Sequence, residues 1–200
     1  MTTPSIAVLR ITLDDVVPKV IRRVVVPGDI RLDRLHLVIQ VVMGWTNSHL
    51  FEFRIGAAGW GIPDPDGIYD GPMDAGKARL NTELARSGRK SFNYIYDFGD
   101  NWSHIIKVEK IMPMSEGRST FILLEASGRC PPEDCGGAPG YERLLETLAD
   151  PDDEEHEDMI AWCGGSFDPT RVDLPALQAN LDRLARRWLP RVRTPEKRRS

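Results

Sequence analysis

The stretch from residue 94 to residue 109 constrains the fold most, because apolar and polar residues alternate on both sides of one short polar break. The break is Gly-Asp-Asn at residues 99–101. Alternation with a period of two is typical of strands, and a break of this composition is typical of a tight turn. The stretch therefore predicts two antiparallel strands joined by a short loop. Four polar or aromatic side chains fall at or beside the turn: Asp97, Asp100, Trp102 and His104.

The rest of the chain predicts strands first and helices last, with one early helix at residues 32–43. Further strands are expected at residues 5–13, 19–26, 49–55 and 120–125, and later helices at residues 139–149, within 150–162 and from 173 onward. A short helical turn capped by Asn81 or Thr82 is expected to end at Gly88, and residues 56–76 have the Gly, Pro and Asp content of a long loop. This order predicts an α+β fold with a mostly antiparallel or mixed sheet of about five to six strands. The early helix should cross one face, beside the C-terminal helices.

Composition favours one compact domain at residues 1–189, followed by a basic, disordered tail at residues 190–200. The net charge of −4 argues against a protein that binds nucleic acid over its whole surface. The tail is either a solvated end or a weak contact for nucleic acid or an acidic partner. The sequence has no apolar run long enough for a membrane span, no visible secretory signal and only three cysteines, which together favour the cytoplasm.

The strand expected at residues 19–26 carries two charges that its apolar neighbours do not explain. Arg22 and Arg23 interrupt the valine and isoleucine residues, one on each face. A charge on a sheet face must reach solvent or a partner, because burying it alone is costly.

Three blocks of sequence occur together in a recognisable order. They are Gly-Trp-Thr-Asn-Ser-His-Leu at residues 44–50, Tyr-Asp-Phe-Gly-Asp-Asn-Trp-Ser-His at 96–104, and Cys-Pro-Pro-Glu-Asp-Cys-Gly-Gly at 130–137. On these blocks the chain resembles the plasmid ORF-3-like family named after an Ri plasmid, some members of which are labelled TnpR-like transposon passenger proteins. The resemblance covers residues 5–185 and implies a single α+β domain. It implies a link to mobile-element biology by name only, and no activity. Cys163 lies outside the family pattern.

Two enzyme classes fail on the residues themselves. The Asp-Phe-Gly at residues 97–99 matches a kinase motif, but the chain has no glycine-rich phosphate loop and no His-Arg-Asp loop. The TnpR label suggests a resolvase, yet we find no serine-recombinase block and no helix-turn-helix module after the domain. Whether the protein is an enzyme stays open, because no complete catalytic set is visible.

Histidine and aspartate near the hairpin form the first candidate site. Asp97, Asp100 and His104 can converge with His49, which begins another predicted strand. Two carboxylates and two imidazoles can bind a divalent metal or act as acid and base. The structural alternative is that the aspartates fix the turn while Trp102 and His104 pack in the core.

The cysteine-rich block at residues 130–137 is the second candidate site. Cys130 and Cys135 are spaced for a zinc site only if His104, His49 or Asp134 completes the ligand set, and the alternative is a loop with free thiols. Candidate binding residues beside the two sites are Trp45, Trp102, Glu133 and Asp134. Three hypotheses follow: a binding or accessory module, a metal-dependent or acid/base enzyme at the hairpin, and a structural zinc or thiol site.

Overall fold

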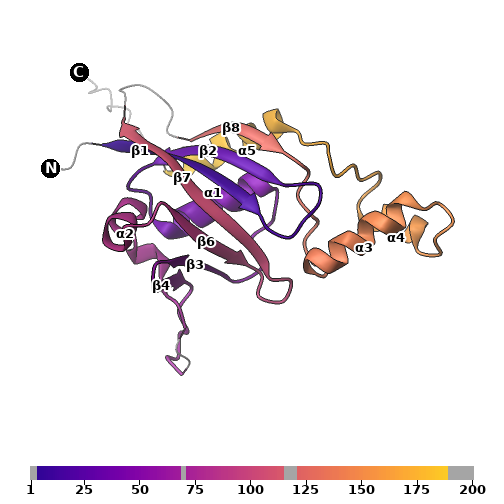
Figure 1. Ribbon diagram of the computed structural model, residues 1–200, viewed down its shortest axis with the longest axis horizontal. Coiled ribbons are helices and arrows are strands. Elements are labelled where there is room, and N and C mark those ends of the chain that lie inside the picture. Colours follow the sequence, from indigo (N-terminus) through magenta and orange to yellow (C-terminus); the bar gives the residue numbers. More distant parts are fainter. Residues whose placement is uncertain (1–3, 69–70, 115–120, 189–200) are drawn as a thin grey trace, which may run out of the picture.

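A single α+β domain is seen in the computed structural model, which describes residues 4–68, 71–114 and 121–188 (Figure 1). The strands are β1 (Ser5–Leu13), β2 (Ile21–Pro27), β3 (Phe51–Ile55), β4 (Ala58–Gly61), β5 (Met73–Asp74), β6 (Ser91–Tyr96), β7 (Trp102–Pro113) and β8 (Ile122–Ser127). The helices are α1 (Leu32–Met43), α2 (Leu80–Ser87), α3 (Gly137–Ala149), α4 (His156–Trp162) and α5 (Leu174–Trp188), with a short 3₁₀ helix η1 (Ala75–Lys77). The basic tail predicted at residues 190–200 lies outside the described residues.

The strands form one eight-stranded sheet in the order β5-β4-β3-β6-β7-β1-β2-β8. Neighbouring strands are antiparallel except β4 and β5, which are parallel, so the mixed sheet is confirmed. The expected count of five to six strands was too low. The additional strands are β4 and β5, four and two residues long, within the segment predicted as a loop. The sequence suggests a short strand there only at residues 60–62, which overlap the end of β4, because strands this short carry little alternating pattern.

Helix α1 lies across one face of the sheet, with α5 packed beside it and over β8 (Figure 1). Leu35, Ile39 and Val42 are fully buried, as their three- and four-residue spacing predicts. The helix ends at Gly44, whose φ of 92° is the left-handed cap conformation and whose N–H donates to the Gln40 carbonyl at 2.9 Å. The prediction for this helix is therefore confirmed.

The central hairpin consists of β6 and β7 and faces α1. Tyr94 pairs with His104 and Tyr96 with Trp102, and all four side chains are buried. Paired residues share a face, so these rings form one aromatic layer beneath α1. The Tyr94 hydroxyl reaches into α1, where it bonds with Gln40 at 3.1 Å.

The remaining helices largely follow the predictions. Asp173 caps α5 as expected, accepting from the Ala176 N–H at 2.9 Å. The cap predicted for α2 was wrong: Arg79 holds that position with an extended backbone and no side-chain bond. No helix in the described ranges combines the length and apolar character that crossing a membrane requires.

Candidate functional site

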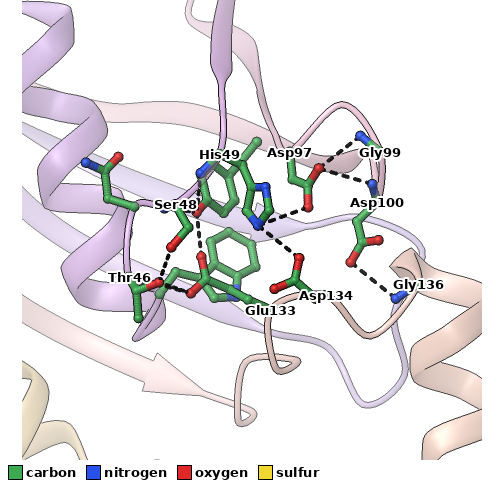
Figure 2. Close-up of polar contacts among 12 residues, drawn as sticks. Thr46, Ser48, His49, Asp97, Gly99, Asp100, Glu133, Asp134 and Gly136 are labelled. Atoms are coloured by element: carbon green, nitrogen blue, oxygen red, sulfur yellow. Dashed lines mark hydrogen bonds and ion pairs between the residues drawn. The ribbon is translucent and has the colours of Figure 1, made fainter.

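Three segments that are distant in sequence meet at the turn between β6 and β7 (Figure 2). The Trp45 indole N–H donates to the Pro131 carbonyl at 3.0 Å, which joins the segment after α1 to the loop before α3. The Gly136 N–H donates to an Asp100 carboxylate oxygen at 3.3 Å, which joins that loop to the hairpin turn. The three motif blocks therefore build one surface.

A glycine allows the loop before α3 to lie against the turn. A Cβ atom at Gly137 would stand 2.4 Å from the Asp100 carbonyl oxygen, too close for any side chain. Gly137 also has φ of 68°, which non-glycine residues rarely adopt. The close approach fixes where Asp134 stands relative to the turn.

Asp97 shapes the turn and presents a carboxylate oxygen at its rim. Its Oδ1 accepts from the Gly99 N–H at 2.9 Å and from the Asp100 N–H at 3.4 Å. Its own backbone has φ of 56°, a conformation that Asp and Asn tolerate best among side-chain-bearing residues. The second oxygen, Oδ2, is left to face His49.

His49 is held in place by the aromatic layer below it. The backbone N–H groups of Ser48 and His49 both donate to the Tyr96 hydroxyl, at 2.9 and 3.3 Å. The imidazole packs edge-on against the Tyr96 ring, with centroids 5.8 Å apart. This contact directs the ring outward between the hairpin turn and the loop before α3 (Figure 2).

The His49 Nε2 atom stands between two carboxylates. It lies 3.0 Å from Asp134 Oδ1 and 3.6 Å from Asp97 Oδ2. The atom is screened from solvent, yet it makes no hydrogen bond of acceptable geometry. The Nε2 and Asp134 Oδ1 atoms are therefore close together, but their orientation is not that of a hydrogen bond.

These three side chains have the ligand types and spacing of a cation site. One nitrogen and two carboxylate oxygens all lie within 4.8 Å of one another, and they form the one such group of three found among the described residues. Two ligands that each stand ~2.1 Å from a shared metal are roughly 3–4 Å apart. The side-chain exposure of 28% for His49 and 69% for Asp134 leaves the group open on one side.

Glu133 supports this arrangement but is not one of the three candidate ligands. One carboxylate oxygen accepts from the Tyr96 hydroxyl at 2.5 Å, and the other accepts from the Thr46 N–H at 2.9 Å and from the Thr46 hydroxyl. Burial, and then the bond with Glu133, raise the pKa of Tyr96 well above its usual value. The phenol therefore keeps its proton and acts as a fixed donor to Glu133.

Comparison with known proteins identifies the family. The family model for the plasmid pRiA4b ORF-3-like protein matches residues 5–176, most of the chain. The chain belongs to this family. An uncharacterised protein of Sinorhizobium fredii, y4hQ, is 48% identical over 190 residues, which cover 94% of this chain and 97% of the relative. The resemblance drawn from the three sequence blocks is thus confirmed.

A solved structure shows the same ORF-3-like fold. The crystal structure of MM3350 from Methanosarcina mazei, a protein of unknown function, matches with a TM-score of 0.77 and 34% identity. The match covers 88% of this chain and 97% of that one. The two relatives are described as uncharacterised and as of unknown function, so neither supplies an activity.

His104, a candidate in the hairpin cluster, lies in the core of this ORF-3-like domain. It has no solvent exposure, and its Nδ1 faces the carbonyl oxygens of Tyr94 at 3.2 Å and Trp102 at 3.1 Å. Burial lowers its pKa to about 4, so the ring is neutral. It packs against the edge of Trp45, with ring centroids 5.4 Å apart. His104 and His49 therefore do not share a site.

Other candidates of the sequence analysis are also placed. Asp100 binds Gly136 N–H and lies outside the His49 group, while Trp45 and Trp102 are buried to 7% and 2% exposure. Cys130 and Cys135 are free thiols, and their sulfur atoms do not form a metal-ligand group with His104. Burial raises the pKa of both thiols, that of Cys135 to about 12, so both are protonated.

Sequence reasoning missed the residues that hold the site together, chiefly Thr46 and Tyr96. Tyr96 alternates with apolar residues, so its pattern indicates a core residue. The available signal was chemical: a buried tyrosine hydroxyl needs a hydrogen-bond partner, and here it has three.

Proposed function

We propose that this protein is a binding module that holds a divalent cation with His49, Asp97 and Asp134. The observation that carries the proposal is the His49 Nε2 atom, which is screened from solvent and lies 3.0 and 3.6 Å from two carboxylate oxygens. A cation placed among these atoms satisfies all three groups at once. The His49 ring would be neutral and would give its Nε2 lone pair to the metal.

The ligand set favours a metal that accepts both nitrogen and oxygen, such as Mn²⁺ or Zn²⁺. Three protein ligands leave further coordination positions for an external ligand. Because Asp134 is largely exposed, that ligand would approach from solvent. The proposed role is therefore to present a bound cation to an oxygen donor on a partner or small molecule.

A second candidate function is a metal-dependent hydrolase. It is favoured by the same open positions, since a metal held by three protein ligands can bind and activate a water molecule. The chemistry the cation would supply is a lowered pKa of that water. Asp97 and Asp134 would orient the metal, and the aromatic layer under His49 would fix the imidazole.

The test is calorimetric titration of chelator-stripped protein with Mn²⁺ and with Zn²⁺. We expect one site per chain, and we expect His49→Ala and Asp134→Ala to weaken binding by on the order of 100-fold. Asp97→Asn should do the same while keeping an acceptor for the turn. His156→Ala is the matched control, because this partly exposed histidine bonds to the Thr147 carbonyl and lies outside the group.

Two outcomes would contradict the cation proposal. One is the absence of binding for both metals. The other is binding that survives His49→Ala and is lost in Cys130→Ser or Cys135→Ser, which would assign the metal to the thiol loop. That outcome would favour the structural zinc hypothesis for residues 130–137.

We also propose, on the family description alone, a link to plasmid or mobile-element biology. The sparse, free cysteines support a cytoplasmic location. The basic tail at residues 190–200 is the proposed nucleic-acid contact. We expect the full chain to bind DNA more weakly as the salt concentration rises. We also expect removal of the tail to abolish this binding. Binding without salt dependence would count against this contact.

A further inference from the structure

A cavity of about 660 Å³ lies next to the cation site and has a different chemical character. Trp45 and Glu133 contribute to its wall, whereas His49, Asp97 and Asp134 do not. The other walls come from the end of α1, the residues before α3, the segment between α4 and α5, and the start of α5. The cavity is therefore formed where the C-terminal helices meet the sheet domain.

Arg22 lines this cavity and is the most unusual residue in it. Its side chain projects from β2 and is only 1% exposed. Nε donates to the Val42 carbonyl at 2.6 Å, and Nη1 donates to the carbonyls of Ile21, Ser127 and Gly128 at 2.9 to 3.0 Å. Every partner is a neutral carbonyl group. No carboxylate in the described part of the chain lies within ion-pair distance of Arg22.

The positive charge of Arg22 is thus buried without a counter-charge. Arginine stays protonated in proteins, although burial lowers the pKa of this one. The Val42 carbonyl belongs to the last turn of α1, whose partial negative charge offsets part of the cost. The second terminal nitrogen, Nη2, has no hydrogen-bond partner among the described residues. An anion in the cavity would supply what is missing.

Two further arginines line the same cavity. The Arg129 guanidinium stacks 4.2 Å from the Phe167 ring centroid and donates to the Ser166 carbonyl at 3.4 Å. Arg171 is exposed and ends the turn that begins at Asp168, whose carbonyl accepts from the Arg171 N–H at 3.2 Å. Neither side chain makes an ion pair among the described residues. Both can therefore turn a donor group toward a ligand.

The acidic residues of the cavity wall are already engaged. Glu133 accepts from Thr46 and Tyr96, Asp168 accepts from the Thr170 N–H at 2.8 Å and hydroxyl at 2.7 Å, and Asp173 caps α5. These bonds direct the carboxylates to the protein's own donors. By contrast, Nη2 of Arg22 and the guanidinium N–H groups of Arg129 other than the one that donates to Ser166 have no hydrogen-bond partner among the described residues. The free hydrogen-bonding capacity of these side chains is therefore that of donors.

We propose that this cavity binds a small organic anion whose carboxylate or phosphate head group is held by Arg22, Arg129 and Arg171. Apolar side chains complete the wall beside the guanidinium groups: Met43, Trp45, Phe167, Val172 and Leu177. A ligand with an anionic end and an aromatic or aliphatic body matches both parts. The site is separate from the cation site and does not require the metal.

The test is titration of chelator-stripped protein with benzoate and with phenyl phosphate, which distinguish the two head groups. Inorganic phosphate and benzyl alcohol separate the contributions of the charge and the apolar body. We expect at least one aromatic anion to bind, and benzyl alcohol to bind at least about tenfold more weakly. Arg129→Gln and Arg171→Gln should each weaken anion binding by about tenfold.

Arg22→Lys tests the buried charge, and circular dichroism establishes whether that variant folds. Arg129→Gln and Arg171→Gln decide the proposal even if Arg22→Lys does not fold. Arg54→Gln is the matched control, because this exposed arginine on β3 lies outside the cavity. The proposal fails if neither aromatic anion binds, if benzyl alcohol binds equally well, or if Arg129→Gln and Arg171→Gln both bind like the parent protein.

Discussion

The turn and the stem of the central hairpin carry the same residue types and give them opposite roles. At the turn, Asp97 and the nearby His49 keep 11% and 28% of their side chains exposed, and His49 Nε2 lies 3.6 Å from Asp97 Oδ2. In the stem, His104 has no exposure and is enclosed by Tyr94, Trp102 and Trp45. The histidines differ in the partners of their nitrogen atoms. His49 Nε2 faces carboxylates, whereas His104 Nδ1 faces strand carbonyls.

The difference indicates how such a domain separates stability from chemistry. The aromatic layer in the stem is buried and closely packed, and the Tyr94 hydroxyl ties it to Gln40 of α1. The Trp102 Nε1 and His104 Nε2 atoms are buried there without a hydrogen-bond partner. The Tyr96 hydroxyl extends this layer to the rim, where it orients the backbone of His49 and anchors Glu133. Substitutions in the stem should therefore change stability, and those at the turn should change binding.

The largest expected effect is in the stem, for His104→Ala. Removal of a fully buried ring leaves a cavity beside Trp45, and we expect a loss of about 3–5 kcal/mol in the free energy of unfolding. His104→Phe fills the space and removes the unpartnered Nε2, so it should cost only about 1–2 kcal/mol. Urea unfolding at neutral pH measures both. A loss below about 1 kcal/mol for His104→Ala would show that the stem tolerates change as an exposed surface does.

The next effect is a loss of stability in acid. Burial lowers the pKa of His104, and that of His36, a buried residue of α1, to about 4, whereas an unfolded chain has the ordinary value of 6.5. Between these values the unfolded state binds more protons, so stability is full above about pH 6.5 and falls as the pH drops toward 4. Each histidine should cost about 2–3 kcal/mol by about pH 4.5.

Urea unfolding at several pH values measures this loss, and His104→Phe provides the comparison. The variant should retain only the part of the acid sensitivity that belongs to His36. Equal acid sensitivity in the two proteins would mean that His104 does not titrate as a buried neutral group.

The sequence predicts the parts of the fold that depend on local patterns. Helix α1 and the hairpin follow from their periodicity, and the end of α1 follows from Gly44. His49 and Asp97 were named as candidates because a turn and a strand end place polar groups at a rim. The burial of His104 also had a signal, since it alternates in register with Trp102 and Ile106. Packing of His104 in the core was the structural alternative to a role in a site, and its complete burial agrees with that alternative.

The remaining parts depend on contacts between distant segments. Asp134 joins His49 only because Gly137 lets its loop approach the turn, and no local pattern encodes that approach. Arg22 was recognised as a charge in need of a partner. The sequence does not show that backbone carbonyls from α1 and from the end of β8 would surround it.

The smallest expected effect on stability is at the turn, for His49→Gln. Because its side chain is partly exposed and its Nε2 makes no hydrogen bond, we expect a change within about 0.5 kcal/mol in chelator-treated protein. Added Zn²⁺ or Mn²⁺ at 100 times the dissociation constant should stabilise the parent protein by roughly 2.7 kcal/mol and the variant by almost nothing. Thermal unfolding with and without metal measures both terms. Equal stabilisation of the two proteins would place the cation elsewhere. A large loss without metal would mean that His49 belongs to the stem, and the contrast between the two regions would then be wrong.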